Sequence, residues 1–184
     1  MPTLIRAALV LLVAVLAAPA SAQAPQYFGL TFPDKVAGFP RGTVVDFEKD
    51  HPGLGYGVHY DSPGWIVTVF IYDDRIKNIP DSLTAETVTA QFAQARGDIY
   101  TNMANRKGKA EDKGRFEIAG PDKKARFICG AYLLTENSQQ LDSYLCLTAW
   151  HGLFVKYRLS TLHANGSAAT AKRYVGTWTP LLWP

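Results

Sequence analysis

The sequence has few cysteines, little excess of either charge and no long apolar run after its first two dozen residues. Two cysteines in 184 residues exclude a disulfide-dense mini-protein, and 15 glycines with 11 prolines exclude a collagen-like rod. With 47% hydrophobic and 19% charged residues, the composition also differs from that of disordered proteins. Because domains usually contain about 100–150 residues, this length predicts one globular domain.

The first 22 residues have the pattern of a secretory signal peptide. Arg6 follows the positive amino terminus, residues 7–18 are almost continuously apolar, and Ala20-Ser21-Ala22 forms an Ala-x-Ala cleavage site. This run is too short for a spanning helix, which needs about 20 residues; an uncleaved N-terminal anchor is the alternative interpretation. Gln23, in place of a cysteine at the cleavage point, excludes lipidation. The sequence predicts a cleavable signal peptide at 1–22, one globular domain at 23–184 and a periplasmic or secreted location, with no stable membrane insertion after cleavage.

The predicted mature chain carries almost no net charge. Removing residues 1–22 removes one basic residue, which leaves 18 basic and 16 acidic residues and a net charge of +2. The single basic cluster, at 106–109, is followed at once by Glu111 and Asp112, as in a solvated loop. A charge this small does not indicate a nucleic-acid partner. We therefore expect none.

The mature chain has mainly the alternating pattern of β-strands. Residues 65–72 are the most β-prone stretch, and both of their faces are apolar enough to predict a central strand. The separators between strands are short, which favours hairpins over crossovers. Residues 23–42 contain three prolines and are interpreted as an extended lead-in. The expected strands are 43–48, 55–60, 65–72, 115–119, 125–135, 141–150 and 153–162.

Two helices interrupt or follow these strands. An apolar stripe at helical spacing predicts a long mid-chain helix, with Thr84 as its N-cap; the stripe is Val88, Phe92, Ala95, Ile99 and Met103. The polar stretch 105–114 is then expected to be a mobile loop. A C-terminal helix is predicted at 167–178, with Ala171, Tyr174, Val175 and Trp178 buried. The predicted fold class is α+β: a mostly antiparallel sheet of about six or seven strands, with the long mid-chain helix and the C-terminal helix packed on it.

The two cysteines lie in consecutive predicted strands. Placing Cys129 opposite Cys146 makes Ala131 face Tyr144 and Leu133 face Asp142, and it centres the connection on the turn residues 137–138. Close antiparallel pairs approach the spacing that a disulfide needs, and an oxidising compartment preserves the bond. The sequence predicts a Cys129–Cys146 disulfide; two buried free thiols are the alternative.

The common signatures of metal, nucleotide and serine-nucleophile sites are absent from the sequence. The four histidines, His51, His59, His151 and His163, have no metal-ligand spacing. The glycines at 53, 55 and 57 precede a strand, whereas a dinucleotide site needs a following helix. No G-x-S-x-G motif occurs. We expect neither a metal nor a cofactor.

Five residues are candidates for a binding groove: His59, Tyr72, Asp73, Lys156 and Arg158. His59 alternates with glycines along a strand, and Asp73 follows the central strand. Lys156 and Arg158 share one strand face and are able to bind an anion, although a solvated outer face is the alternative. We expect a non-enzymatic binding or assembly module for a protein or small-molecule partner. A small secreted hydrolase that uses His59 with Asp73 or Asp74 is the second hypothesis.

Four stretches of the chain look familiar together: Gly38-Phe39, 55–60, 68–72 and 154–158. They resemble a group of small exported bacterial proteins without an assigned activity. The order of strands, helix, strands and final helix is similar to the PsbP-like α/β/α sandwich. That resemblance implies a non-enzymatic binding or assembly factor, although a fold does not by itself determine a function.

Overall fold

The computed structural model describes residues 25–164 and 166–184. The predicted signal peptide at 1–22, with its cleavage residues Ala20 and Ala22, lies outside the described residues. In the described part, eight strands form one antiparallel sheet in the order β3-β4-β5-β6-β10-β9-β8-β7, and a small hairpin, β1-β2, stands apart. The strands are β1 (Gln26–Tyr27), β2 (Leu30–Thr31), β3 (Lys35–Val36), β4 (Phe39–Asp46), β5 (Tyr56–Tyr60), β6 (Trp65–Tyr72), β7 (Lys109–Ala119), β8 (Ala125–Glu136), β9 (Gln139–Trp150) and β10 (Leu153–Leu162).

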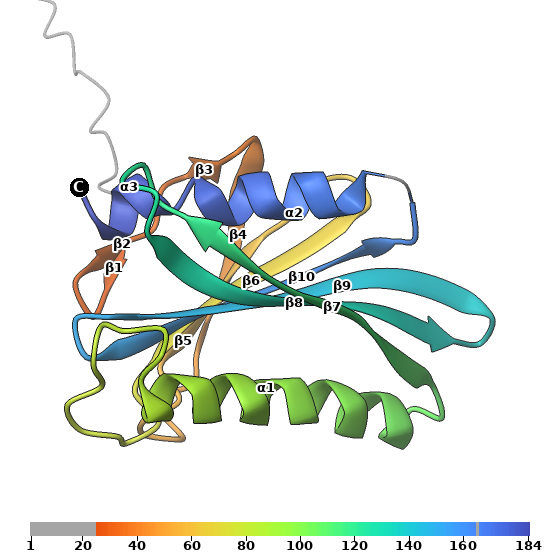
Figure 1. Ribbon diagram of the computed structural model, residues 1–184, viewed down its shortest axis with the longest axis horizontal. Helices are drawn as coiled ribbons and strands as arrows, with labels where there is room; N and C mark the ends of the chain where they lie inside the picture. The colour runs from red at the N-terminus through yellow and green to blue at the C-terminus, as the bar shows by residue number, and fades with distance from the viewer. Residues whose placement is uncertain (1–24, 165) are drawn as a thin grey trace, which may run out of the picture.

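The sheet consists of two four-stranded meanders, β3–β6 and β7–β10, each followed by a helix. The last strands of the two meanders, β6 and β10, pair with each other at the centre. Helix α1 (Glu86–Asn105) lies on one face of the sheet, and α2 (Ser167–Gly176) and α3 (Thr179–Leu182) lie on the other (Figure 1). This arrangement confirms an α+β fold with a large antiparallel sheet.

The number of strands predicted from the sequence is wrong, because the sheet has eight. Residues 35–40, interpreted as part of an extended lead-in, form β3 and the start of β4. Pro40 pairs with Lys35 at the edge of the sheet, where a missing N–H group is tolerated. The predicted mobile loop is also wrong, because β7 begins at Lys109. This strand forms the other edge and is exposed on most of its length, so its polar sequence lacks the usual alternation.

Helix α1 carries the predicted apolar stripe, and all five of its residues are buried. Its N-cap is Ala85 and not Thr84, whose hydroxyl instead contacts Ser82 Oγ at 3.1 Å. The predicted C-terminal helix is divided, because α2 ends at Gly176 and α3 follows it. The buried stripe predicted for it is confirmed, with Ala171, Tyr174, Val175 and Trp178 all in the core.

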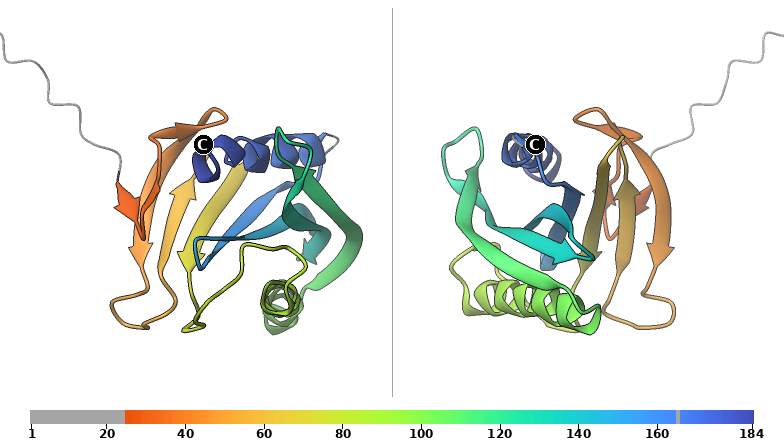
Figure 2. Two further views of the ribbon diagram at one scale, coloured as in Figure 1. Left: turned by 60° about the vertical axis from the view of Figure 1, so that its left-hand side comes forward. Right: turned by 90° about the vertical axis from the view of Figure 1, so that its right-hand side faces the viewer.

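Each face of the sheet has its own hydrophobic core. Val67, Val69 and Ile71 of β6 contribute to the core beneath α2, and Phe70 and Tyr72 contribute to the core beneath α1. The prediction that this strand is central and covered on both faces is therefore confirmed. The sheet is strongly curved, and α1 lies against β7, β8 and β9 and not beneath β4 and β5 (Figure 2).

The predicted register of the β8–β9 hairpin is confirmed residue by residue. Cys129 pairs with Cys146, Ala131 with Tyr144 and Leu133 with Asp142. The two cysteines are joined in a disulfide across these neighbouring strands. Asn137 and Ser138 both have positive φ, as a two-residue hairpin turn requires.

Candidate functional site

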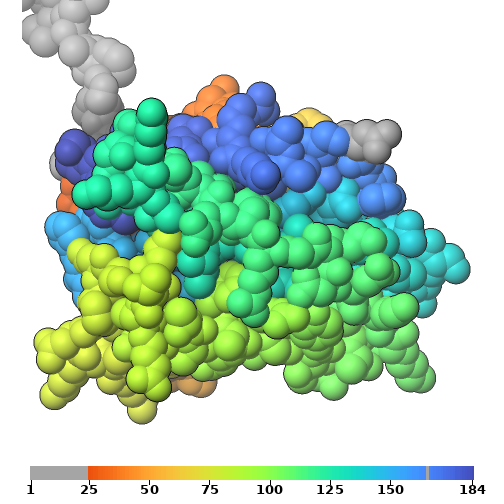
Figure 3. Space-filling model, in the orientation of Figure 1, coloured from red at the N-terminus to blue at the C-terminus, as the bar shows by residue number. Residues whose placement is uncertain are grey.

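A groove of about 590 Å³ runs between α1 and the central strands of the sheet. The side of α1 that faces away from the groove contacts β7, and side chains of the two elements adjoin there (Figure 3). The groove is lined by the C-terminal half of α1, by β6 and β10, and by the end of the β8–β9 hairpin. Its volume is within the range of about 300–1,000 Å³ that is usual for small-molecule sites.

Two cations, Lys156 and Arg158, line the groove from β10. Their neighbours Val155, Tyr157 and Leu159 point into the core beneath α2, so alternation along the strand directs Lys156 and Arg158 to the α1 side. Both side chains are half-buried. Both cations therefore face the α1 side and are partly covered.

Aromatic rings and a hydroxyl hold the two cations in place. Lys156 Nζ lies 4.8 Å from the ring centroid of Phe70 and 5.0 Å from that of Tyr72. Arg158 Nη2 donates a hydrogen bond of 3.1 Å to Ser143 Oγ. Within residues 25–164 and 166–184, no carboxylate oxygen lies within 4.0 Å of either cation. The two positive charges therefore lack an ion-pair partner in the described part of the chain.

The surroundings of these cations disfavour their charge. Burial lowers the pKa of Lys156, and the nearby charge of Arg158 lowers it further, against a smaller opposing effect of Asp98 and Asp74. Burial also lowers the pKa of Arg158 to about 10, so its guanidinium is still protonated at neutral pH. An anion bound between the two would favour both charged forms.

The rest of the groove is mainly apolar. Ile66, on β6, lines the groove and is 66% exposed. Arg106 and Glu136, which also line it, form an ion pair with a 3.0 Å hydrogen bond between Nε and Oε1, so their charges cancel. The remaining apolar lining residues are Phe70, Ala95, Ile99, Met103, Leu134 and Leu141.

The other predicted site residues lie near the groove without lining it. Tyr72 is only 5% exposed, and its hydroxyl accepts a 3.1 Å hydrogen bond from Gln91 Nε2. Its ring makes the cation–π contact with Lys156 described above. His59 pairs with Thr68, which pairs with Arg158, so the three residues form one row across β5, β6 and β10. The His59 Nδ1 atom contacts Thr68 Oγ1 at 3.2 Å.

The structure does not bring His59 to Asp73 or Asp74. Thr68, the partner of His59, lies four residues before Tyr72, a distance of about 13 Å along a strand. Asp73 comes after the end of that strand, and its Oδ1 accepts a 2.8 Å hydrogen bond from the Arg75 amide. The acid–base pair of the hydrolase hypothesis is therefore not assembled.

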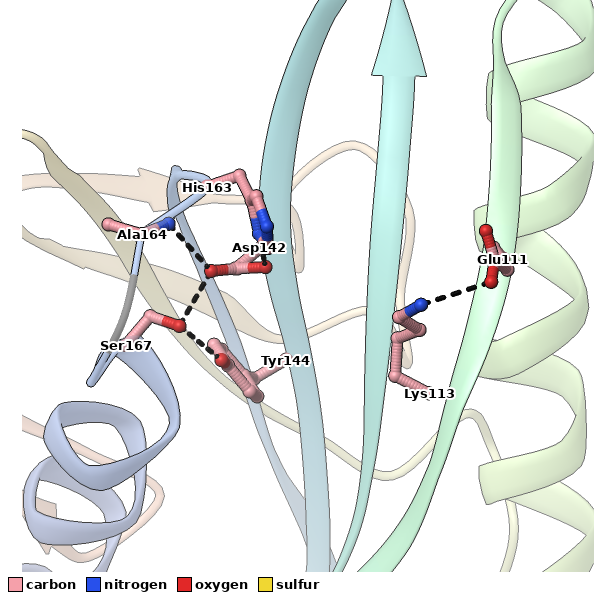
Figure 4. Close-up of polar contacts among 7 residues, drawn as sticks. All are labelled: Glu111, Lys113, Asp142, Tyr144, His163, Ala164 and Ser167. Carbon is pink, nitrogen blue, oxygen red and sulfur yellow. Dashed lines mark hydrogen bonds and ion pairs between the residues drawn. The ribbon is translucent and has the colours of Figure 1, made fainter.

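A second polar cluster joins Asp142, His163 and Ser167 (Figure 4). Ser167 Oγ donates to Asp142 Oδ2 at 2.6 Å, and His163 Nδ1 contacts Asp142 Oδ1 at 2.7 Å. In a catalytic triad the histidine lies between serine and carboxylate, whereas here the carboxylate lies between serine and histidine. Ser167 is the first residue of α2, so the cluster attaches this helix to β9. Burial raises the pKa of Asp142, but hydrogen bonds from Ser167, His163 and Ala164 lower it to a net value below the usual range.

No protein-family model matches the chain, and no curated protein matches it by sequence. Among solved structures, the chain is similar to cyanobacterial PsbP (CyanoP) from Synechocystis sp. PCC 6803, with 16% identity and a TM-score of 0.47 over 74% of this chain and 79% of that one.

Residues 25–164 and 166–184 were compared with the patterns of membrane-spanning helices and of metal sites. None of their helices is both long and apolar enough to cross a membrane. No three of their His, Cys, Asp and Glu side chains gather in a way that could hold a metal ion.

Proposed function

We propose that this chain is an exported, non-enzymatic binding module that takes a small organic anion into the groove between α1 and the sheet. The observation that carries the proposal is the pair Lys156 and Arg158, half-buried in the groove without a carboxylate partner among the described residues. Removing a charge from water without a partner costs free energy, which a bound anion would offset. The signal-peptide pattern at 1–22 supports export.

The composition of the groove supports a binding role. Ligand sites are mostly apolar with a few convergent polar groups, and this groove has that composition. The hydrolase hypothesis has no comparable support, because His59 lies away from Asp73 and Asp74.

Two fluorescent probes that differ by one charged group test this function. Anilinonaphthalene sulfonate carries an anionic group, and phenylnaphthylamine is the same molecule without it. We expect the sulfonate to bind, and the double variant Lys156→Met, Arg158→Met to weaken its binding about tenfold or more, because charge-assisted contacts contribute about 1.5–3 kcal/mol each. Binding of the neutral probe should stay within about twofold of wild type.

The matched control is Lys172→Met, Arg173→Met. Both residues are exposed on α2, on the other face of the sheet, and the pair changes the net charge by the same amount. If both double variants bind the sulfonate as wild type does, the groove is not an anion site and the proposal is wrong.

A further inference from the structure

The charges that line the groove sum to a single positive charge. Lys156 and Arg158 contribute two positive charges, and Asp98, on the α1 side, contributes one negative charge. Arg106 and Glu136 neutralise each other in their ion pair. A ligand that restores neutrality therefore carries one negative charge, as a carboxylate does and a phosphate dianion does not.

The two cations of β10 and the leucines of the groove lie apart along its length, and the neutralised pair Arg106 and Glu136 lies near the leucines. Lys156 and Arg158 lie at one end, next to Phe70. The other end is formed by Leu134 and Leu141, which pair with each other across β8 and β9. Leu141 pairs with Leu162 on β10, which lies about 13 Å along the strand from Arg158 and about 20 Å from Lys156.

Apolar side chains accompany this path on both sides. Ile99 and Met103 line it from the helix α1, and Ile66 lines it from the strand β6. Such walls offer an inorganic anion nothing to bind, whereas an alkyl chain gains free energy with every methylene group that leaves water.

Resting on the function proposed above, we infer that the ligand is a single-chain amphiphile whose monoanionic head group binds Lys156 and Arg158 and whose alkyl tail lies along Ile66, Met103 and Leu141. Asp98 lines the same groove from α1 and adds a negative charge to it. It therefore opposes binding and restricts the site to one negative charge.

Isothermal titration with acetate, octanoate, decanoate and dodecanoate, each below its micelle concentration, tests the inference. We expect no measurable binding of acetate and tighter binding with each added methylene, up to about fourfold per methylene when burial is complete. Decanol should bind at least about tenfold more weakly than decanoate, because it lacks the charged head group.

Three variants assign the two ends of the ligand. Lys156→Met should weaken decanoate binding about tenfold. Asp98→Asn should tighten it severalfold, because a like charge is removed. Ile66→Ser should reduce the dependence on chain length, and Leu181→Ser, at an exposed leucine of α3 on the other face, should not.

The outcomes separate this inference from the proposed function. If acetate binds as tightly as dodecanoate and Lys156→Met weakens both, the anion site stands and the amphiphile inference is overturned. If no anion binds to wild type, both are overturned. If alkanoates bind but Lys156→Met and Asp98→Asn leave the affinity unchanged, the head group does not lie where we place it, and the inference falls.

A two-chain membrane lipid carries the same kind of anionic head group and apolar tails as a fatty acid, and it is the competing occupant. Sedimentation with phosphatidylglycerol vesicles separates the two occupants. Decanoate binding without retention on vesicles indicates a free single-chain amphiphile and supports the inference. Retention that Lys156→Met abolishes indicates a two-chain lipid and contradicts the single-chain ligand. Retention that Lys156→Met leaves unchanged, without decanoate binding, contradicts it.

Discussion

Lys156 is a single residue in which the requirements of binding and of stability oppose each other. Its lowered pKa means that the folded protein disfavours the protonated form. We therefore predict that Lys156→Met raises the free energy of unfolding by about 0.5–1 kcal/mol at neutral pH, a small gain because the side chain is half-buried. Urea denaturation measures this. A loss of stability would mean that the contacts with Phe70 and Tyr72 outweigh the cost of burial.

The lowered pKa of Lys156 also predicts how the free energy of unfolding changes with pH. Its pKa is lower in the folded than in the unfolded chain, where it is near 10.5. Between these two values only the unfolded chain holds the proton, so stability rises with pH in that window. The wild type should therefore approach Lys156→Met in stability as pH is raised towards 10.5, and its affinity for decanoate should fall over the same range.

Asp142 gives the opposite case, a carboxylate that the fold stabilises. Asp142→Asn should lower the free energy of unfolding by about 1–3 kcal/mol at neutral pH, because its hydrogen-bonded charge holds the start of α2. Its pKa is lowered in the fold, so this contribution is present above the usual pKa of 3.8 and is lost as pH falls below it.

Urea titrations at neutral pH and at pH values below 3.8 measure that change. Asp122→Asn is the matched control, because Asp122 forms a surface ion pair with Arg126 and should contribute less than about 1 kcal/mol. Equal effects of the two variants at neutral pH would show that the Asp142 cluster does not hold α2.

Among the elements, α1 is both a wall of the groove and the cover of one core. Phe92 is the largest side chain of its buried stripe and is 3% exposed. Phe92→Ala should lower the free energy of unfolding by about 3–5 kcal/mol, and Gln94→Ala, on the exposed side of the same helix, should change it by less than about 0.5 kcal/mol. An unchanged urea midpoint for Phe92→Ala would contradict the packing of α1 on the sheet.

The β8–β9 hairpin is the element in which the disulfide acts. The bond links residues 17 positions apart, and loop entropy alone would assign such a loop about 3 kcal/mol. Because the strands are already neighbours, we predict that Cys129→Ala with Cys146→Ala costs less than this. Hydrogen exchange should show faster opening of β8 and β9 in the variant, with α1 much less affected. Two alkylatable thiols in oxidised, exported protein would show that the bridge does not form.

The elements that the sequence predicts well are those whose signal is local. The register of β8 and β9 follows from two cysteines and a turn that lie within a few residues of one another. The first half of β7, residues 109–114, was missed because this part of the edge strand is largely exposed and shows no apolar alternation. The start of α1 was misplaced by one residue, because Thr84 is a good capping residue whose hydroxyl bonds Ser82 instead.

At the scale of the whole molecule, the groove depends on how α1 lies relative to β6 and β10, which are distant from it in the sheet or in the sequence. Alternation along 153–162 predicts that Lys156 and Arg158 share a face. It does not predict that α1 covers β7–β9 and leaves an open flank over β10, because this depends on the curvature of the entire sheet. Asp98 and Ile66 were missed for the same reason: in sequence each is an ordinary surface residue of its element.

Export also concerns the molecule as a whole. We predict that the exported protein begins at Gln23, because Ala20-Ser21-Ala22 matches the cleavage pattern. Intact-mass measurement on the extracytoplasmic fraction tests this. Retention of Met1 in a membrane fraction would instead show an uncleaved anchor.

The pairing of β6 with β10 decides when this chain can fold. Trp65 pairs with Thr161 and Tyr72 with Phe154, so the middle of the sheet is closed by its most distant partners in sequence. Chains leave the ribosome amino terminus first, and pairings over such long separations form slowly. In the first meander, the outer edge of β6 therefore has no partner until β10, the last strand, has been made. Because the sheet closes only after β10 has been made, we expect the chain to stay unfolded during synthesis. Export through a secretory pore requires an unfolded chain.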